Sequence, residues 1–243
     1  MRLDHLRVER EGPVVTLRLR GTALGRREAA ELVSVATDLA EDPSVRVVVL
    51  DSDGPDLCPG AADDLDPLSF SPDPAAALAA LRPPVVAACR GRVASVGLEL
   101  ALACDVRVAE PGTVFTIADV AAGRLPSWGG TQRLPRVAGR STALAMILLG
   151  ESLDAAAAQR AGLVTAVADD AGARAVTLAG QLAELAPAAL ELAKEAVARG
   201  AELPMRDALV LEGDLNHLLQ TTADRAEGLA AFFDKRPPTF TGR

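Results

Sequence analysis

Three consecutive segments near the middle of the chain decide the fold class: Val85-Val86-Ala87-Ala88-Cys89, then Gly97-Leu98-Glu99-Leu100-Ala101-Leu102-Ala103-Cys104, then Val106-Arg107-Val108-Ala109. The first and third are short apolar runs of strand length, and the middle one is rich in leucine and alanine, as buried helices are. A strand, a helix and a second strand in this order favour an α/β protein.

The middle segment also contains a charge that needs a reason. Glu99 is the one charged residue between Gly97 and Cys104, and carboxylates are rarely buried without a partner. Asp119 lies in a similarly apolar run at residues 115–122. Burial raises the pKa of a carboxyl group, and two acids in one pocket separate into a proton donor and a proton acceptor. The alternatives are an ion pair with a buried arginine for Glu99, and an N-cap or turn acid for Asp119.

The same alternation of strands and helices extends toward the N-terminus. Residues 14–19 and 45–50 predict strands on either side of a helical pattern at 27–39, which indicates a crossover unit and a partly parallel sheet. Residues 114–117 predict another strand. Toward the C-terminus the pattern becomes almost wholly helical, with one brief strand expected at 164–167. We therefore expect an α/β region over residues 1–170 and a helical region over residues 171–243.

Composition restricts the function classes. The chain has 243 residues, of which 49% are hydrophobic, and a formal net charge of −8. This length fits one domain with a small appendage. A non-specific nucleic-acid binder needs a basic stripe and aromatic platforms, whereas only 2% of these residues are aromatic and none is Tyr. The core is expected to be aliphatic, and a nucleic-acid partner is not.

Cysteine and histidine usage gives further limits. The three cysteines lack CxxC spacing, and the two histidines, His5 and His217, lie in no cluster with metal-ligand spacing, so neither disulfides nor a metal are expected. The first residues lack the apolar segment of a signal peptide, and no apolar run is long enough to span a bilayer. The expectation is a cytoplasmic protein with no membrane partner.

Two glycine-containing segments follow strands, at residues 57–65 and 90–99. Neither is a GxGxxG or Walker A motif, so a nucleotide-binding fingerprint is not indicated. Each can present a free backbone N–H near the start of a helix, where the dipole favours a negative charge. When each segment is considered alone, an ordinary turn is the favoured explanation.

Four motifs together carry a family resemblance. They are Glu99-Leu100-Ala101-Leu102-Ala103-Cys104-Asp105, Pro126-Ser127-Trp128-Gly129-Gly130-Thr131-Gln132-Arg133-Leu134, Ala158-Gln159-Arg160-Ala161-Gly162-Leu163-Val164 and Glu227-Gly228-Leu229-Ala230-Ala231-Phe232-Phe233-Asp234-Lys235-Arg236. In this order and spacing the chain resembles the enoyl-CoA hydratase/isomerase (crotonase) superfamily over nearly its whole length.

The resemblance implies a fold and a ligand. The fold is a spiral of ββα units that binds acyl-CoA, here residues 1–170, followed by a helical oligomerisation region at 171–243 that forms a homotrimer or a dimer of trimers. The ligand is an acyl-CoA thioester, and no cofactor is implied because coenzyme A is part of the substrate.

The resemblance also implies roles for individual residues. Backbone N–H groups of Ala61 and Val96 form an oxyanion hole for the thioester oxygen, and Glu99 and Asp119 match the two acids that hold a water over the double bond. Residues that match substrate-binding or CoA-binding positions are Ala23, Leu24, Gly60, Ala62, Gly97, Trp128, Phe232 and Lys235. Trp128 and Phe232 as core residues, and Lys235 as a solvated side chain, remain alternatives.

Three departures from the family pattern bear on activity. The usual glycine-rich run is Ala94-Ser95-Val96-Gly97, so the hole requires that Val96 is not left-handed. Ala62 stands where an aspartate is usual. Asp119 replaces a glutamate and is shorter by one methylene, roughly 1.5 Å, where a misplacement of about 1 Å can cost on the order of 10²-fold in rate.

The leading hypothesis is hydration of a 2-enoyl-CoA to a 3-hydroxyacyl-CoA. The alternatives are a Δ3-Δ2 isomerase that uses one acid, and a catalytically weak acyl-CoA-binding protein.

Overall fold

The computed structural model describes residues 3–242. Its main sheet has six strands in the order β1-β2-β3-β4-β6-β9. β1 pairs antiparallel with β2, and every later neighbour in this sheet is parallel. The strands are β1 (Arg7–Glu11), β2 (Val14–Leu19), β3 (Val47–Ser52), β4 (Val85–Cys89), β6 (Val106–Ala109) and β9 (Ala166–Val167). The expected α/β class with a partly parallel sheet is confirmed.

A smaller sheet lies beside the main one. β5 (Arg92–Ala94) pairs parallel with β7 (Val114–Thr116), which pairs antiparallel with β8 (Leu153–Asp154). Because β5 follows β4 after a two-residue turn, Arg90 and Gly91, the chain passes directly from the main sheet into the small one. This change of sheet places the start of the next helix at the edge between the two sheets, where the candidate site lies.

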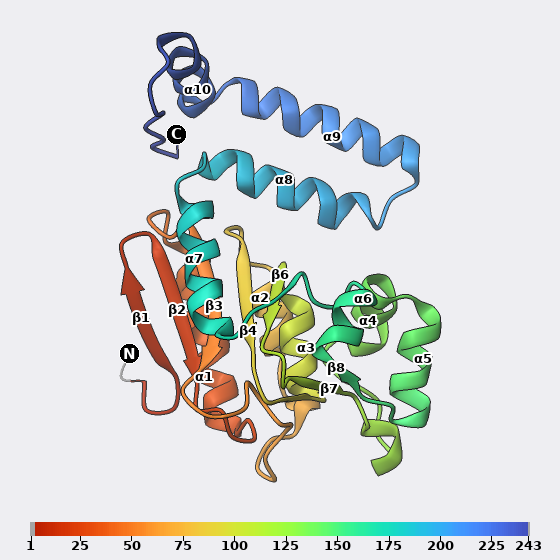
Figure 1. The fold of residues 1–243 in the computed structure, drawn as a ribbon. Helices are drawn as coiled ribbons and strands as arrows, with labels where there is room; N and C mark the ends of the chain where they lie inside the picture. The colour runs from red at the N-terminus through yellow and green to blue at the C-terminus, as the bar shows by residue number, and fades with distance from the viewer. Residues whose placement is uncertain (1–2, 243) are drawn as a thin grey trace.

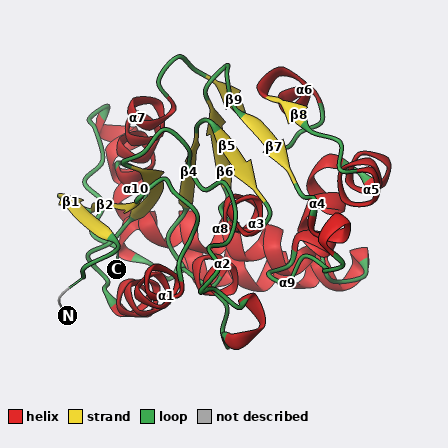
Figure 2. Cartoon of the chain, turned by 90° about the horizontal axis from the view of Figure 1, so that it is seen from below, coloured by secondary structure: helices red, strands yellow, loops and turns green. Residues whose placement is uncertain are grey.

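Helices cover both faces of the main sheet (Figure 2). Alternate residues of β3 point to opposite faces: Val48 and Leu50 join the core beneath α1 (Arg26–Glu41), α2 (Pro74–Ala79) and α3 (Val96–Ala103). Val47 and Val49 join a second core against α7 (Ala171–Ala183), which presents Ala171, Ala175, Ala179 and Ala183 to the sheet. The small residues at a spacing of four let this helix pack closely on the strands.

The remaining short helices lie between residues 67 and 160, and the last of them contacts β7 and β8 of the second sheet. These are η1 (Pro67–Ser69) and η2 (Asp119–Ala122), which are 3-10 helices, and α4 (Gly130–Ala138), α5 (Arg140–Leu149) and α6 (Ala155–Arg160). Gly139, with φ of 80°, ends α4 and begins α5, so the two helices form a sharp corner. In Figure 1, α4, α5 and α6 lie on the side of the molecule away from the β1–β2 hairpin.

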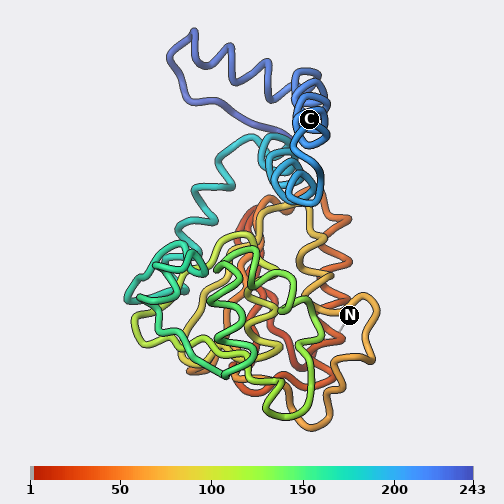
Figure 3. The backbone as a smooth tube through the Cα atoms, turned by 90° about the vertical axis from the view of Figure 1, so that its right-hand side faces the viewer, coloured from red at the N-terminus to blue at the C-terminus, as the bar shows by residue number. Residues whose placement is uncertain are grey.

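The last three helices stand apart from the sheets. α8 (Pro187–Gly200), α9 (Met205–Gln220) and α10 (Ala223–Asp234) form an arm above the body, as Figures 1 and 3 show. None of the residues of α8 is buried, and large apolar side chains on the arm are exposed, among them Val197, Met205, Val210, Phe232 and Phe233. α7 differs from these helices because it is packed on the sheet. Within residues 3–242, no helix has the length and apolar character needed to cross a membrane.

Candidate active site

The two proposed oxyanion donors lie on neighbouring segments that run in parallel. Cys58 forms a parallel bridge with Val93 of β5, through Cys58 N–H to Arg92 O at 3.4 Å and Ala94 N–H to Cys58 O at 3.0 Å. Ala61 and Val96 each follow this bridge by three residues. Because the two segments run in the same direction, Ala61 and Val96 lie at the same end of the paired region.

In the bridge between Leu24 and Ala61, the residues on either side of Ala61 make the hydrogen bonds. Leu24 pairs with Ala61 by donating to Gly60 O and accepting from Ala62 N–H, both at 2.8 Å. In a parallel bridge the N–H of the residue opposite points to the other side. Gly60 has φ of 134°, which only glycine adopts easily, so it turns the chain between the two bridges. Ala62 takes part in this arrangement through its backbone alone, so the aspartate side chain that is usual at this position is not needed for it.

Val96 satisfies the backbone condition set by its branched side chain. It is the first residue of α3, and the left-handed residue is Ser95, with φ of 46° and ψ of −117°. As the first helical residue, Val96 has no acceptor for its N–H within the helix, and the helix dipole makes this end favourable for negative charge. The departure from a glycine-rich run thus places the backbone strain on Ser95 and leaves the donor in ordinary helical geometry.

Gly97 is the reason the two donor segments approach so closely. A Cβ built at this position would lie 2.2 Å from Cys58 O and 2.7 Å from Cys58 Cβ. Any side chain here would push α3 away from the segment that carries Ala61. The role of Gly97 is therefore to allow close packing of two backbones.

Glu99 lies in the first turn of α3, and backbone amides from another segment hold its carboxyl group. It is 1% exposed, and its Oε1 accepts the N–H of Trp128 and the N–H of Gly130, each at 2.7 Å. Burial raises its pKa to about 7, the two N–H groups act in the opposite direction, and the charge of Asp119 raises it further. The alternative of an ion pair with a buried arginine is wrong, because no basic side chain within residues 3–242 pairs with Glu99.

Asp119 is the first residue of η2 and is 8% exposed. Its two oxygens have different surroundings. Oδ1 lies 3.9 Å from Nη2 of Arg124, whereas Oδ2 is buried and has no hydrogen-bond partner in the part of the chain that the structure describes. The N-cap half of the alternative is wrong, since the N-cap of η2 is Ala118 and no side chain caps this turn. Asp119 does lie in a turn, which is the other half of that alternative. An unpartnered carboxylate oxygen beside Glu99 is a position where a water or a substrate proton would be bound.

Trp128 connects the loop that precedes α4 with the segment around η1. It is 1% exposed, its indole Nε1–H donates to Pro67 O at 2.9 Å, and its ring meets Phe70 edge-on with centroids 6.4 Å apart. Its backbone N–H is one of the two that hold Glu99. Trp128 thus fixes the loop at residues 124–128 to η1 and to the candidate acid at once.

The other expected substrate contacts differ in their distance from this centre. Ala23 is exposed on the loop before α1, and Leu24 is buried and pairs directly with Ala61. Phe232 is 77% exposed on α10, and Lys235 ends that helix in a left-handed conformation. Figure 1 shows α10 at the end of the arm, far from α3, so this chain does not by itself bring them to the acids.

Sequence reasoning missed three residues that organise the site. Gly130 supplies an N–H to Glu99, Ser95 takes the left-handed conformation, and Arg124 lies against Asp119. The pair Gly129-Gly130 just before a helix was the one available signal, since such positions present free N–H groups. Nothing in the sequence singled out Ser95 or Arg124.

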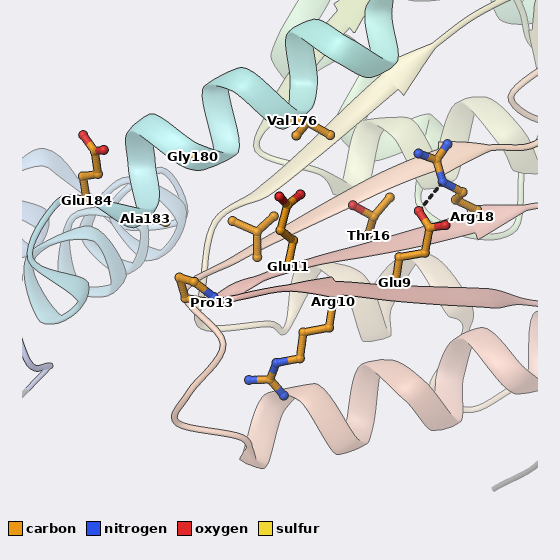
Figure 4. Close-up of a pocket in the computed structure, with 11 residues that line it drawn as sticks. Glu9, Arg10, Glu11, Pro13, Thr16, Arg18, Val176, Gly180, Ala183 and Glu184 are labelled. Carbon is orange, nitrogen blue, oxygen red and sulfur yellow. Dashed lines mark hydrogen bonds and ion pairs between the residues drawn. The ribbon is translucent and has the colours of Figure 1, made fainter.

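A cavity of about 1000 Å³ lies on the opposite face of the main sheet. It lies between the β1–β2 hairpin and α7 (Figure 4), where Val14, Thr16 and Arg18 face the helix. Glu9 and Arg18 in its wall pair with each other at 2.8 Å. None of the candidate site residues lines this cavity, so it is separate from the site described here.

Comparison with known proteins shows which proteins this chain is similar to. The sequence model of the family described as enoyl-CoA hydratase/isomerase matches residues 13–243. A probable enoyl-CoA hydratase of Mycobacterium tuberculosis is 37% identical over 231 residues, covering 91% of this chain and 90% of the relative. The 2,3-dehydroadipyl-CoA hydratase of Escherichia coli is 37% identical over 255 residues, covering 99% and 100%.

Solved structures give the same result. The crystal structure of an enoyl-CoA hydratase from Bacillus anthracis matches with a TM-score of 0.91 at 29% identity, covering 99% of this chain and 100% of the other. That of a putative enoyl-CoA hydratase from Streptomyces coelicolor matches with a TM-score of 0.92 at 31% identity, covering 100% and 96%. The fold is thus the crotonase fold that the sequence motifs led us to expect, and the chain belongs to the enoyl-CoA hydratase/isomerase family.

Proposed function

We propose that this chain is an enoyl-CoA hydratase, which reversibly adds water to a 2-enoyl-CoA and gives a 3-hydroxyacyl-CoA. One observation carries the proposal: two buried carboxylates, Glu99 and Asp119, lie close enough for the charge of one to affect the pKa of the other. Hydration needs two proton transfers on one substrate, and two acids meet that need.

The oxyanion hole would provide the electrostatic part of catalysis. The N–H groups of Ala61 and Val96 would donate to the thioester oxygen, on which negative charge develops when water adds to C3. The register between Cys58 and Val93 and the N-terminus of α3 support this role. Loss of one such donor typically costs about 2.7–4 kcal/mol of transition-state stabilisation.

The two acids would move the protons. As the oxygen of water bonds to C3, the C2–C3 π electrons form an enolate on the thioester, and the water loses one proton to one carboxylate. The enolate then takes a proton at C2 from the other acid, which re-forms the thioester carbonyl. Exchange of protons with solvent then returns both acids to their starting states. The pKa of Glu99, about 7, suits a group that gives and receives a proton near neutrality.

The test is loss of the enoyl absorbance of crotonyl-CoA and of longer 2-enoyl-CoA thioesters. Glu99→Gln should lower kcat strongly, since Gln accepts the same N–H groups but cannot transfer the proton. Glu28→Gln is a matched control, because Glu28 is also a buried glutamate that accepts a backbone N–H, here from Arg20 at 2.8 Å. If the wild-type protein leaves the absorbance unchanged, the hydratase proposal is wrong.

A Δ3-Δ2 isomerase is the second candidate, favoured by the unpartnered Oδ2 of Asp119, since a single acid can carry a proton between C2 and C4. Feeding a 3-enoyl-CoA to the Glu99→Gln variant separates the two activities. An isomerase that depends on Asp119 alone keeps its rate in this variant, whereas a hydratase that needs both acids does not.

The exposed apolar arm supports a proposal about assembly. We propose a homotrimer, or a dimer of such trimers, in which α8, α9 and α10 pack against neighbouring subunits and bring Phe232 and Lys235 to a neighbour's CoA. Because α7 is buried on the sheet, the oligomerisation region would begin at Pro187 and not at residue 171. Light scattering coupled to size exclusion measures the mass directly.

We further propose that the enzyme needs nothing besides its CoA substrate and works in the cytoplasm. Both acids and both donors belong to the protein itself, so no step above requires a metal or a redox group. The three cysteines are free thiols, as is usual in a reducing compartment. Activity that survives dialysis against a chelator supports the first statement, and fractionation of the source cells tests the second.

A further inference from the structure

Arg124 is the basic residue that lies against the candidate acid Asp119. Its backbone N–H donates to the carbonyl oxygen of Asp119 at 3.0 Å, and its Nη2 lies 3.9 Å from Asp119 Oδ1. Gly123, left-handed with φ of 69°, turns the chain back so that both contacts form. Within residues 3–242, no other basic side chain pairs with Asp119 or Glu99.

The contact makes the two oxygens of Asp119 unequal. Oδ1 faces a guanidinium whose side chain is 65% exposed, so this oxygen points toward solvent. Oδ2 then points inward, where it is buried and has no partner in the described part of the chain. A buried acceptor without a partner is costly, so this orientation needs something to maintain it.

The shortness of the side chain explains why an external contact is needed. A glutamate has one more rotatable bond and can extend toward the substrate from several backbone positions, whereas the aspartate must be aimed by rotation about a single Cα–Cβ bond and the carboxyl group. Asp119 is also fixed at the start of a 3-10 helix. Rotation of its carboxyl group is therefore the main freedom left, and a cation on one oxygen restricts it.

We infer that Arg124 is a positioning residue, which holds Asp119 through Oδ1 and thereby directs Oδ2 at the reacting water or carbon. This inference rests on the proposed hydratase function. Arg124 itself touches neither the substrate nor the reacting atoms, so its effect is transmitted through Asp119. Because the guanidinium is exposed and lies 3.9 Å from Oδ1, the pair contributes little to folding stability.

The experiment compares Arg124→Ala, Arg124→Lys and Arg124→Gln with the wild-type protein on crotonyl-CoA. Arg124→Ala should lower kcat on the order of 10- to 100-fold with little change in KM, because a reacting oxygen is misplaced while binding is kept. Arg124→Lys should retain more activity than Arg124→Gln, since it keeps the charge. Free guanidinium, well below unfolding concentrations, should restore part of the activity of Arg124→Ala.

A second variant makes the test specific to the short acid. In an Asp119→Glu background the longer side chain reaches the reacting water or carbon without Arg124. Removal of Arg124 should therefore lower kcat several-fold less in this background than it does beside Asp119. A merely structural role for Arg124 would give the same loss in both backgrounds and no guanidinium rescue. Such a result overturns the inference.

The control is Arg10→Ala, since Arg10 also forms an exposed pair with an aspartate, Asp42 at 2.8 Å, on the far edge of the main sheet. It should leave kcat unchanged and should not respond to guanidinium. If the wild-type protein turns over crotonyl-CoA and Arg124→Ala does so equally well, the inference fails and the proposed function stands. If the wild-type protein turns over no enoyl-CoA, both fail.

Discussion

Gly130 donates its backbone N–H to Oε1 of Glu99 at 2.7 Å, and a Cβ added to Gly130 would lie only 3.0 Å from that same oxygen. The acid is therefore held by a backbone that has room for no side chain. A Cβ would also lie 2.7 Å from Cδ1 of Ile117. The glycine is needed here for close approach, while the donated N–H is available because α4 begins at this residue.

Gly130→Ala should therefore lower activity by moving Glu99. The new methyl group forces either the carboxyl group or α4 to shift by several tenths of an ångström, and we expect kcat to fall on the order of 10- to 100-fold. Overpacking should also lower the free energy of unfolding by about 1–3 kcal/mol. Steady-state kinetics and urea unfolding measure the two effects. Unchanged kcat in a destabilised variant would contradict the proposed role of Glu99.

The pKa of Glu99 predicts a dependence of stability on pH. The ordinary pKa of a glutamate is 4.5, and that of Glu99 in the folded protein is about 7. Between these two pH values the folded protein keeps a proton that the unfolded chain releases. The free energy of unfolding therefore falls as pH rises through this window. Glu99→Gln removes this titration. Its free energy of unfolding, measured relative to that of the wild type, should therefore rise by on the order of 3 kcal/mol from pH 5 to pH 8. Urea unfolding of both proteins at the two pH values measures it; an equal difference at both pH values would show that Glu99 titrates normally.

The strands that could be predicted from the sequence are those with an apolar pattern. Residues 14–19, 85–89 and 106–109 are strands as expected, and the expected strand at 45–50 lies at Val47–Ser52. β1 was missed because its sequence, Arg7–Glu11, is mostly charged and exposed: an edge strand of a hairpin has no buried face to give a pattern. β5, with three residues, is too short to give one.

The site was only partly predictable for a different reason. Glu99 and Asp119 were recognisable because a charge in an apolar run is unusual, and the family resemblance supplied Ala61 and Val96. Ser95 and Arg124 gave no such signal, since their roles depend on where the chain brings them. The packing of α7 was visible in principle: alanines at 171, 175, 179 and 183 form the stripe that meets the sheet.

The strain at Ser95 predicts a stabilising substitution. With φ of 46° and ψ of −117°, this residue occupies a region that glycine adopts easily and serine does not. Such strain costs roughly 1–3 kcal/mol, against about 0.4–1 kcal/mol for the added freedom of glycine when unfolded. Ser95→Gly should raise the unfolding midpoint and keep kcat, since the N–H of Val96 is retained. Ser95→Val, which cannot adopt this conformation, should lower both stability and kcat; a stable and active Val variant would contradict the assignment of strain.

Gly97→Ala tests the oxyanion hole directly. Its Cβ would collide with Cys58 O, a backbone atom that cannot move aside, so α3 must retreat from the segment carrying Ala61. The two N–H groups then separate, and loss of one effective donor typically lowers kcat about 10²- to 10³-fold. The matched control is Gly180→Ala on α7, where a Cβ meets nothing within 4 Å and the higher helix propensity of alanine should stabilise the protein by about 1 kcal/mol. Calorimetric binding of CoA thioesters separates the outcomes: retained binding with lost turnover locates the defect in transition-state stabilisation, whereas full activity in Gly97→Ala would mean that the Ala61 and Val96 amides do not form the hole.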